Sequence, residues 1–186
     1  IDKSHHLKVI GNQDSTCFVS GAITFYRDNA VSIRDYLNDP IRKKRVLDEQ
    51  INQLFRGIEI STSGWKGLED LTQPVSVIFE GKVSNFLTPT DNGFVLNPIL
   101  DKLNLSRYVP APQREYPLHI NSVVAQSNYQ IELVLPDNLS IGEKPPDTLE
   151  ISPYGNYQLH WTPVSDHQWL GERSVIIPKL KIKKEK

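Results

Sequence analysis

The chain contains no methionine and a single cysteine among its 186 residues. One thiol excludes an internal disulfide and any zinc site built from several cysteines. No apolar run approaches the ~20 residues that a transmembrane helix needs. Neither charge is in excess, because 21 basic and 22 acidic residues leave a formal net charge of -1. We therefore expect no membrane span and no nucleic-acid partner, since nucleic-acid binders usually carry a concentrated basic surface.

The start of the chain gives two further expectations. Because the first residue is Ile1 rather than methionine, we expect a fragment, a processed product or an excised domain. Residues 1–10 are polar and include a His-His pair, which suggests a linker from a preceding domain. The five histidines could supply metal ligands, but their spacing fits neither an H-x-x-x-H nor an H-E-x-x-H pattern, so we expect no metal site. We expect no cofactor either. These histidines are His5, His6, His119, His160 and His167.

Residues 17–25 alternate between apolar and small polar side chains, with Cys17, Val19, Ile23 and Phe25 on the same face. A period of two indicates a strand with one face toward a core. A nucleophilic cysteine needs a helix N-terminus or a nearby cation to lower its pKa. The sequence around Cys17 offers neither, so we predict a buried and unreactive thiol.

A helical segment, interrupted once, is predicted between residues 31 and 58. Asp39 and Pro40 mark a restart, because aspartate is a good N-cap and proline fits the first helical position. Beyond them apolar residues recur at steps of three and four, which indicates one buried helix face. They are Leu47, Ile51, Leu54, Phe55 and Ile58. The opposite face is charged, and Gly57 is the expected stop.

The remaining sequence is typical of strands and turns. Residues 75–83 alternate after Pro74, and Gly81 in this run suggests a bulge or a close backbone approach. A turn is predicted at residues 91–93 and a helical turn at 100–105. Residues 110–112 (Pro-Ala-Pro) form the expected linker. Later strands are predicted at 118–124, 129–135, 149–152, 157–161 and 174–177, with a tail strand to residue 182.

These elements predict a β-rich α+β fold. The first subdomain, residues 1–110, would be an antiparallel sheet covered by one amphipathic helix. The second, residues 111–186, would be a β-sandwich-like module, because several short strands separated by turns are typical of sandwiches. The two subdomains could also pack into a single body.

The order of several motifs resembles one protein family. A Gly-Ala strand at residues 21–25 precedes the helix and a strand at 74–79, and Arg114, Pro117 and Leu118 lead into the later strands. Leu-Pro at 135–136, Pro-Pro at 145–146 and Pro-Tyr-Gly-Asn-Tyr at 153–157 complete the series. This order is similar to the region C-terminal to the catalytic core in bacterial transglutaminase-like proteins.

The resemblance implies a non-catalytic accessory region of a larger cysteine-peptidase-like protein. Its partners would be an upstream Cys-His-Asp catalytic domain of the same polypeptide and a further protein. Such proteins are commonly periplasmic or associated with the cell envelope. None of the family's catalytic motifs occurs in this chain, because Cys17 lies within a strand rather than at a helix N-terminus.

The aromatic residues of the second half support an alternative. Tyr154, Trp161 and Trp169 could form a ligand surface on which sugar rings or a peptide stack. Core packing also accounts for Trp161, which lies two positions from Leu159. The alternative function is therefore a ligand-binding β-sandwich for glycan or peptide, and an autonomous enzyme ranks third.

Overall fold

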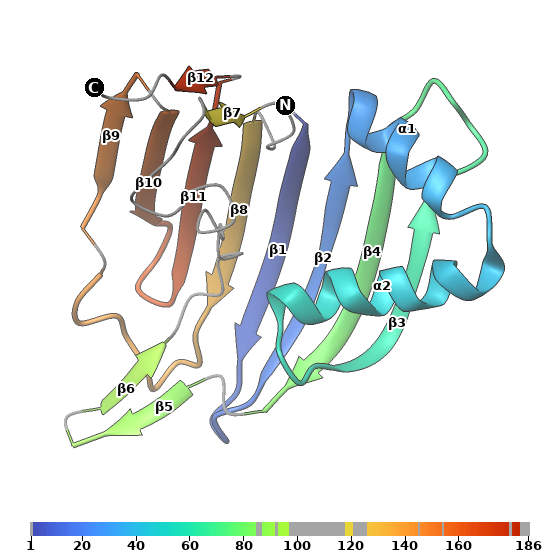
Figure 1. Cartoon of the computed structure of the whole chain (residues 1–186). Helices are drawn as coiled ribbons and strands as arrows, with labels where there is room; N and C mark the ends of the chain where they lie inside the picture. The colour runs from blue at the N-terminus through green and yellow to red at the C-terminus, as the bar shows by residue number, and fades with distance from the viewer. Residues whose placement is uncertain are drawn as a thin grey trace.

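The computed structural model describes residues 2–84, 87–91, 93–96, 118–120, 126–144, 146–153, 155–178 and 180–182. Within these ranges the chain forms an eight-stranded mixed sheet with two helices against one face (Figure 1). The strands are β1 (Lys3–Gly11), β2 (Cys17–Phe25), β3 (Glu59–Lys66), β4 (Val75–Val83), β5 (Leu87–Thr90), β6 (Gly93–Leu96), β7 (Leu118–Ile120), β8 (Gln126–Val134), β9 (Thr148–Ser152), β10 (Gly155–Pro163), β11 (Gln168–Ile176) and β12 (Leu180–Ile182).

The large sheet has the order β3-β4-β2-β1-β8-β11-β10-β9, and β5-β6 and β12-β7 form two small two-stranded sheets. All neighbours in the large sheet are antiparallel except β1 and β8, which are parallel. The strands of residues 1–110 in this sheet thus pair antiparallel, as predicted, but the parallel contact of β1 with β8 makes the whole sheet mixed. A sandwich is not seen in the described residues, because β8 to β11 extend the same sheet. Alternating apolar residues correctly predict a strand with one buried face, but they do not identify which strand pairs with it.

The N-terminal residues form a central strand, so the prediction of a linker was wrong. β1 lies between β2 and β8, and its alternate residues His5, Leu7 and Val9 are buried. The intervening residues His6 and Lys8 point to the opposite face. Polar side chains at every second position concealed this alternation in the sequence.

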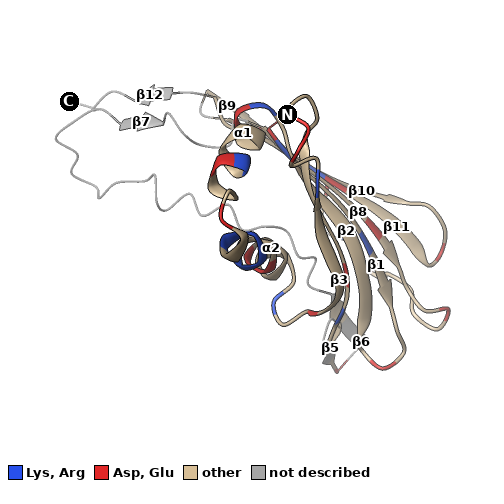
Figure 2. Cartoon of the chain, turned by 90° about the vertical axis from the view of Figure 1, so that its right-hand side faces the viewer, with Lys and Arg blue, Asp and Glu red and all other residues tan. Residues whose placement is uncertain are grey.

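Both helices lie on one side of the sheet, as Figure 2 shows. The buried residues of the sheet are on this face. The expected interruption is confirmed, since α1 (Arg27–Tyr36) ends before α2 (Pro40–Leu54) begins. The Asp39 side chain accepts a hydrogen bond from the Ile41 backbone N–H at 2.9 Å, which caps α2 as predicted. Two helices, rather than one, therefore cover the sheet.

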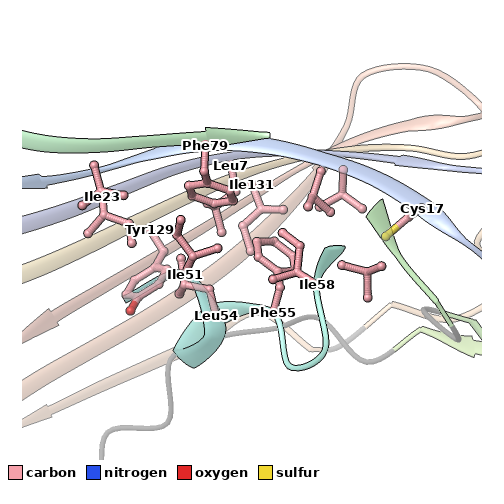
Figure 3. Packing of buried hydrophobic residues seen from close by; sticks show 14 of the residues in the cluster. Leu7, Cys17, Ile23, Ile51, Leu54, Phe55, Ile58, Phe79, Tyr129 and Ile131 are labelled. Atoms are coloured by element: carbon pink, nitrogen blue, oxygen red, sulfur yellow. The ribbon is translucent and has the colours of Figure 1, made fainter. Parts of the chain in front are cut away.

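The core lies between the helices and the sheet, and its buried residues come from β1, β2, β4 and β8 as well as from α2. Figure 3 shows Ile51, Leu54 and Phe55 facing Phe79 and Leu7, and the two phenylalanine ring centroids are 6.0 Å apart. The predicted apolar stripe of the helix is thus confirmed as its buried face. Full burial of a large apolar side chain stabilises the fold by about 1.5–3 kcal/mol.

The predicted close approach at Gly81 is also confirmed. A Cβ at this position would lie 2.7 Å from the backbone oxygen of Glu59 and 2.8 Å from the Ile58 side chain. The register of β3 against β4 shifts beside it, between Ile60 and Thr62. The predicted linker at 110–112, the helical turn at 100–105 and the boundary between the two expected subdomains lie outside the described residues.

Candidate functional site

An open groove of about 420 Å³ lies on the outer face of the sheet, which we define as the face opposite the helices. We call it the outer groove. Its walls come from the central strands β2, β1, β8 and β11 and from the β10–β11 connection. The lining residues are His6, Leu7, Lys8, Ser20, Gly21, Gln130, Glu132, Val164, Gln168 and Leu170.

Strand register brings the polar side chains of the outer groove together. Lys8 is opposite Glu132 on β8 and opposite Ser20 on β2. One carboxylate oxygen of Glu132 accepts hydrogen bonds from Lys8 Nζ at 2.7 Å and from Gln168 Nε2 at 2.9 Å. These contacts hold the carboxylate in one orientation at the centre of the sheet.

Ser20, Lys8 and Glu132 thus form one row of polar side chains across neighbouring strands, and His6 and Gln130 form a second row beside it. His6 is opposite Gln130, and the His6 Nδ1 atom lies 2.9 Å from Gln130 Oε1. His6 and Gln130 therefore orient each other, and the remaining polar atoms of both side chains can contact a ligand. Leu170 and Val164 add an apolar border, and Val164 is 59% exposed.

The charges of the outer groove are only partly shielded from water. The side chains of Lys8 and Glu132 are 44% and 34% exposed. An ion pair at this exposure contributes about 1 kcal/mol or less to stability. A ligand could therefore exchange partners with either charge at little cost. The groove offers an ammonium, a carboxylate, an imidazole, two amides and a hydroxyl, which are groups that hydrogen-bond peptides and other polar molecules.

Two residues of the predicted aromatic surface, Trp161 and Trp169, lie on the other face of the sheet. Trp161 on β10 is opposite Gly171 of β11, and Trp169 on β11 is opposite Pro163, so both indoles share the helix-side face. Trp161 is only 4% exposed, and a Cβ at Gly171 would lie 2.7 Å from its Cη2 atom. Trp169 is half-buried and packs against the core. Tyr154 lies outside the described residues.

Cys17 is fully buried in β2, as predicted, and burial raises the pKa of its thiol to about 12. His160 is exposed, and its Nδ1 atom lies 2.9 Å from the Asp147 carboxylate. The Lys144 ammonium, which donates to Asp147 at 3.0 Å, is the main cause of the lowered pKa of that carboxyl. Across the described ranges, no three histidine, cysteine or carboxylate side chains converge as metal ligands would.

The helix-side face also carries a stacked row of buried polar residues that was not predicted from the sequence. The rings of His5 and Tyr129 are parallel within 10°, with centroids 3.8 Å apart, and the Arg173 guanidinium lies 3.9 Å from the Tyr129 centroid. Burial, aided by the nearby Lys3 charge, lowers the pKa of His5 to about 2. His5 therefore stays neutral. The signal for its burial in the sequence was that His5, Leu7 and Val9 stand at alternate positions, as residues on one face of a strand do.

Comparisons with family models, curated proteins and solved structures find no match for this chain. The fold itself defines a β-rich α+β class, a mixed sheet with helices on one face. None of the helices in the described ranges is long and apolar enough to cross a membrane.

Proposed function

We propose that this chain is a non-catalytic interaction domain that binds a polar, extended segment of a protein partner in the outer groove. The observation that carries the proposal is the pair of ordered rows, Lys8 with Glu132 and His6 with Gln130, on central strands. Central strands are rigid, so the polar groups keep their positions before a ligand arrives. Preorganisation of this kind lowers the entropic cost of binding.

The volume of the groove agrees with a short peptide segment. Ligand sites usually enclose about 300–1,000 Å³, and the outer groove has about 420 Å³. Amide side chains such as those of Gln130 and Gln168 can donate to a backbone carbonyl and accept from a backbone N–H. The exposed Val164 offers an apolar contact at the border of the groove.

We further propose that the chain serves as an accessory region of a larger, exported transglutaminase-like protein. The motif order supports this placement, and a segment of the upstream catalytic domain is then the first candidate for the groove. Reading the gene upstream of Ile1 tests it. An upstream region without a cysteine, histidine and aspartate in the order of a transglutaminase core would refute the placement.

The groove can be tested by photo-crosslinking in the complete polypeptide expressed from its own gene. A photoreactive phenylalanine derivative replaces Val164, at the groove, or Val31, on α1 with a similar exposure of 56%. We expect the probe at Val164 to label one defined peptide, identified by mass spectrometry. A Lys8→Glu substitution should abolish this crosslink. Equal labelling from both positions, or labelling that is unaffected by Lys8→Glu, would refute the proposal.

A ligand-binding module for glycans remains the second candidate, through Trp161 and Trp169. The specific observation is that the indole N–H groups of both residues are buried and have no hydrogen-bond acceptor within the described chain. A sugar hydroxyl could serve as the acceptor if the ring faces opened. Affinity electrophoresis in gels containing soluble polysaccharide tests this, and mobility that Trp169→Ala leaves unchanged would eliminate it.

A further inference from the structure

The outermost strand β9 carries exposed apolar side chains at the edge of the sheet, away from the outer groove. β9 has a single neighbour among the described strands, β10, and Figure 1 shows it at the edge of the sheet. Leu149 and Ile151 are 66% and 73% exposed, although both are apolar. They lie two positions apart on one face, whereas Glu150 points to the other face. Among the described strands, none lies beside Leu149, Glu150 and Ile151 on the side away from β10, and this edge also carries an apolar surface.

The opposite edge strand, β3, differs in ways that protect it. Its register against β4 shifts between Ile60 and Thr62, and it ends in Lys66. Trp65 also donates its indole N–H to the Lys43 backbone oxygen of α2 at 3.2 Å. Bulges, lysines and covering helices are the usual means by which proteins prevent an edge strand from pairing with another chain.

β9 has none of these protections in its described residues. Its register with β10 is continuous from Thr148 to Ser152, and the strand contains neither proline nor lysine. Leu149 and Ile151 remain highly exposed, so no described element covers that face. An edge of this kind is suited to β-strand addition, in which a partner segment hydrogen-bonds along the free side of the strand.

We propose that β9 binds an extended segment of a partner protein in which a basic residue lies between two apolar residues. Apolar side chains of the added strand would pack beside Leu149 and Ile151 on the outer face. The basic residue would lie beside Glu150 on the other face. Opposite charges on directly paired strands stabilise a sheet, so Glu150 selects for lysine or arginine at this position.

The charge of Glu150 also argues against a second copy of the chain as the occupant. If two β9 strands paired antiparallel over all five residues, Glu150 would lie directly opposite its own equivalent. Like charges at opposed positions destabilise strand pairing. The electrostatics therefore favour a basic partner segment over self-association.

The proposal can be tested by nuclear magnetic resonance titration of the protein with two capped pentapeptides. One has a central lysine between two valines, with glutamine at each end, and the other has glutamate in place of lysine. We expect saturable shifts of the backbone amides of residues 148–152 with the lysine peptide. The glutamate peptide should bind at least tenfold more weakly. A Glu150→Lys substitution should reverse this preference.

A matched variant separates this effect from the general charge of the protein. Glu172→Lys makes the same charge change at an exposed position of β11, a strand that has neighbours on both sides. This variant should keep the preference for the lysine peptide. The amide spectrum of each variant shows whether it is folded. The proposal is wrong if neither peptide shifts β9, if the Glu150→Lys protein keeps the original preference, or if β9 amides shift with protein concentration alone.

Discussion

The buried imidazole of His5 should make the protein lose stability as the pH falls below 7. The unfolded chain takes up a proton on this residue near pH 6.5, whereas the folded protein resists protonation until about pH 2. The unfolded state therefore binds more protons between these values, and the free energy of unfolding falls with pH. The loss is about 1.4 kcal/mol per pH unit below 6.5, which gives about 2 kcal/mol at pH 5.

The surroundings of His5 explain why protonation is so unfavourable. The side chain is 1% exposed, so its charged form would lose nearly all hydration. The positive charges of Lys3, Arg173 and His6 oppose a further positive charge, and a contact with the Asn128 backbone offsets them only in part. The facing ring of Tyr129 is stacked on the imidazole.

Urea denaturation of the wild-type protein and of His5→Phe, at pH 7 and pH 5, measures the effect. Phenylalanine retains an aromatic ring beside Tyr129 but cannot take up a proton. We expect the loss of stability between pH 7 and pH 5 to be about 2 kcal/mol smaller in His5→Phe. An identical pH dependence in His5→Phe and the wild type would refute the reasoning, as would a His5 resonance that titrates near pH 6.5.

Three further predictions concern other parts of the fold. The buried Cys17 thiol ionises only after unfolding, so the free energy of unfolding should fall above pH 9, by about 2 kcal/mol at pH 10.5. A thiol reagent should also label the folded protein far more slowly than the urea-unfolded chain. Gly81→Ala places a methyl group against the Glu59 backbone oxygen and should destabilise the protein by roughly 1–3 kcal/mol in urea denaturation, whereas Gly64→Ala, where a Cβ meets no atom, should cost less. Arg34 donates to four backbone oxygens between residues 67 and 73, so Arg34→Ala should speed amide hydrogen exchange in that loop and leave exchange in β8 unchanged.

Local patterns predicted the elements whose cause is local. The alternation of residues 17–25 and 75–83 reflects burial of one strand face, and the structure has strands with the same bounds. The break before α2 was predictable because Asp39 and Pro40 determine a helix start within three residues. The thiol of Cys17 is buried for the same reason, since it occupies the apolar side of its strand.

Long-range pairing explains what the sequence did not predict. Lys8 and Glu132 are 124 positions apart, and only the parallel register of β1 and β8 makes them neighbours. The outer groove therefore had no local motif that could reveal it. The central position of β1 was missed because its buried face includes a histidine, and burial of His5 depends on neighbours from distant strands.

The parallel contact between β1 and β8 divides the large sheet into two four-stranded halves, and among the described strands it is the one ladder that joins them. Within each half, neighbouring strands come from one part of the chain, so each half can form through comparatively short loops. Joining them requires closure of a far longer loop, which costs more chain entropy and slows folding. We expect the junction to form last and to be the line along which the sheet first separates under denaturing stress.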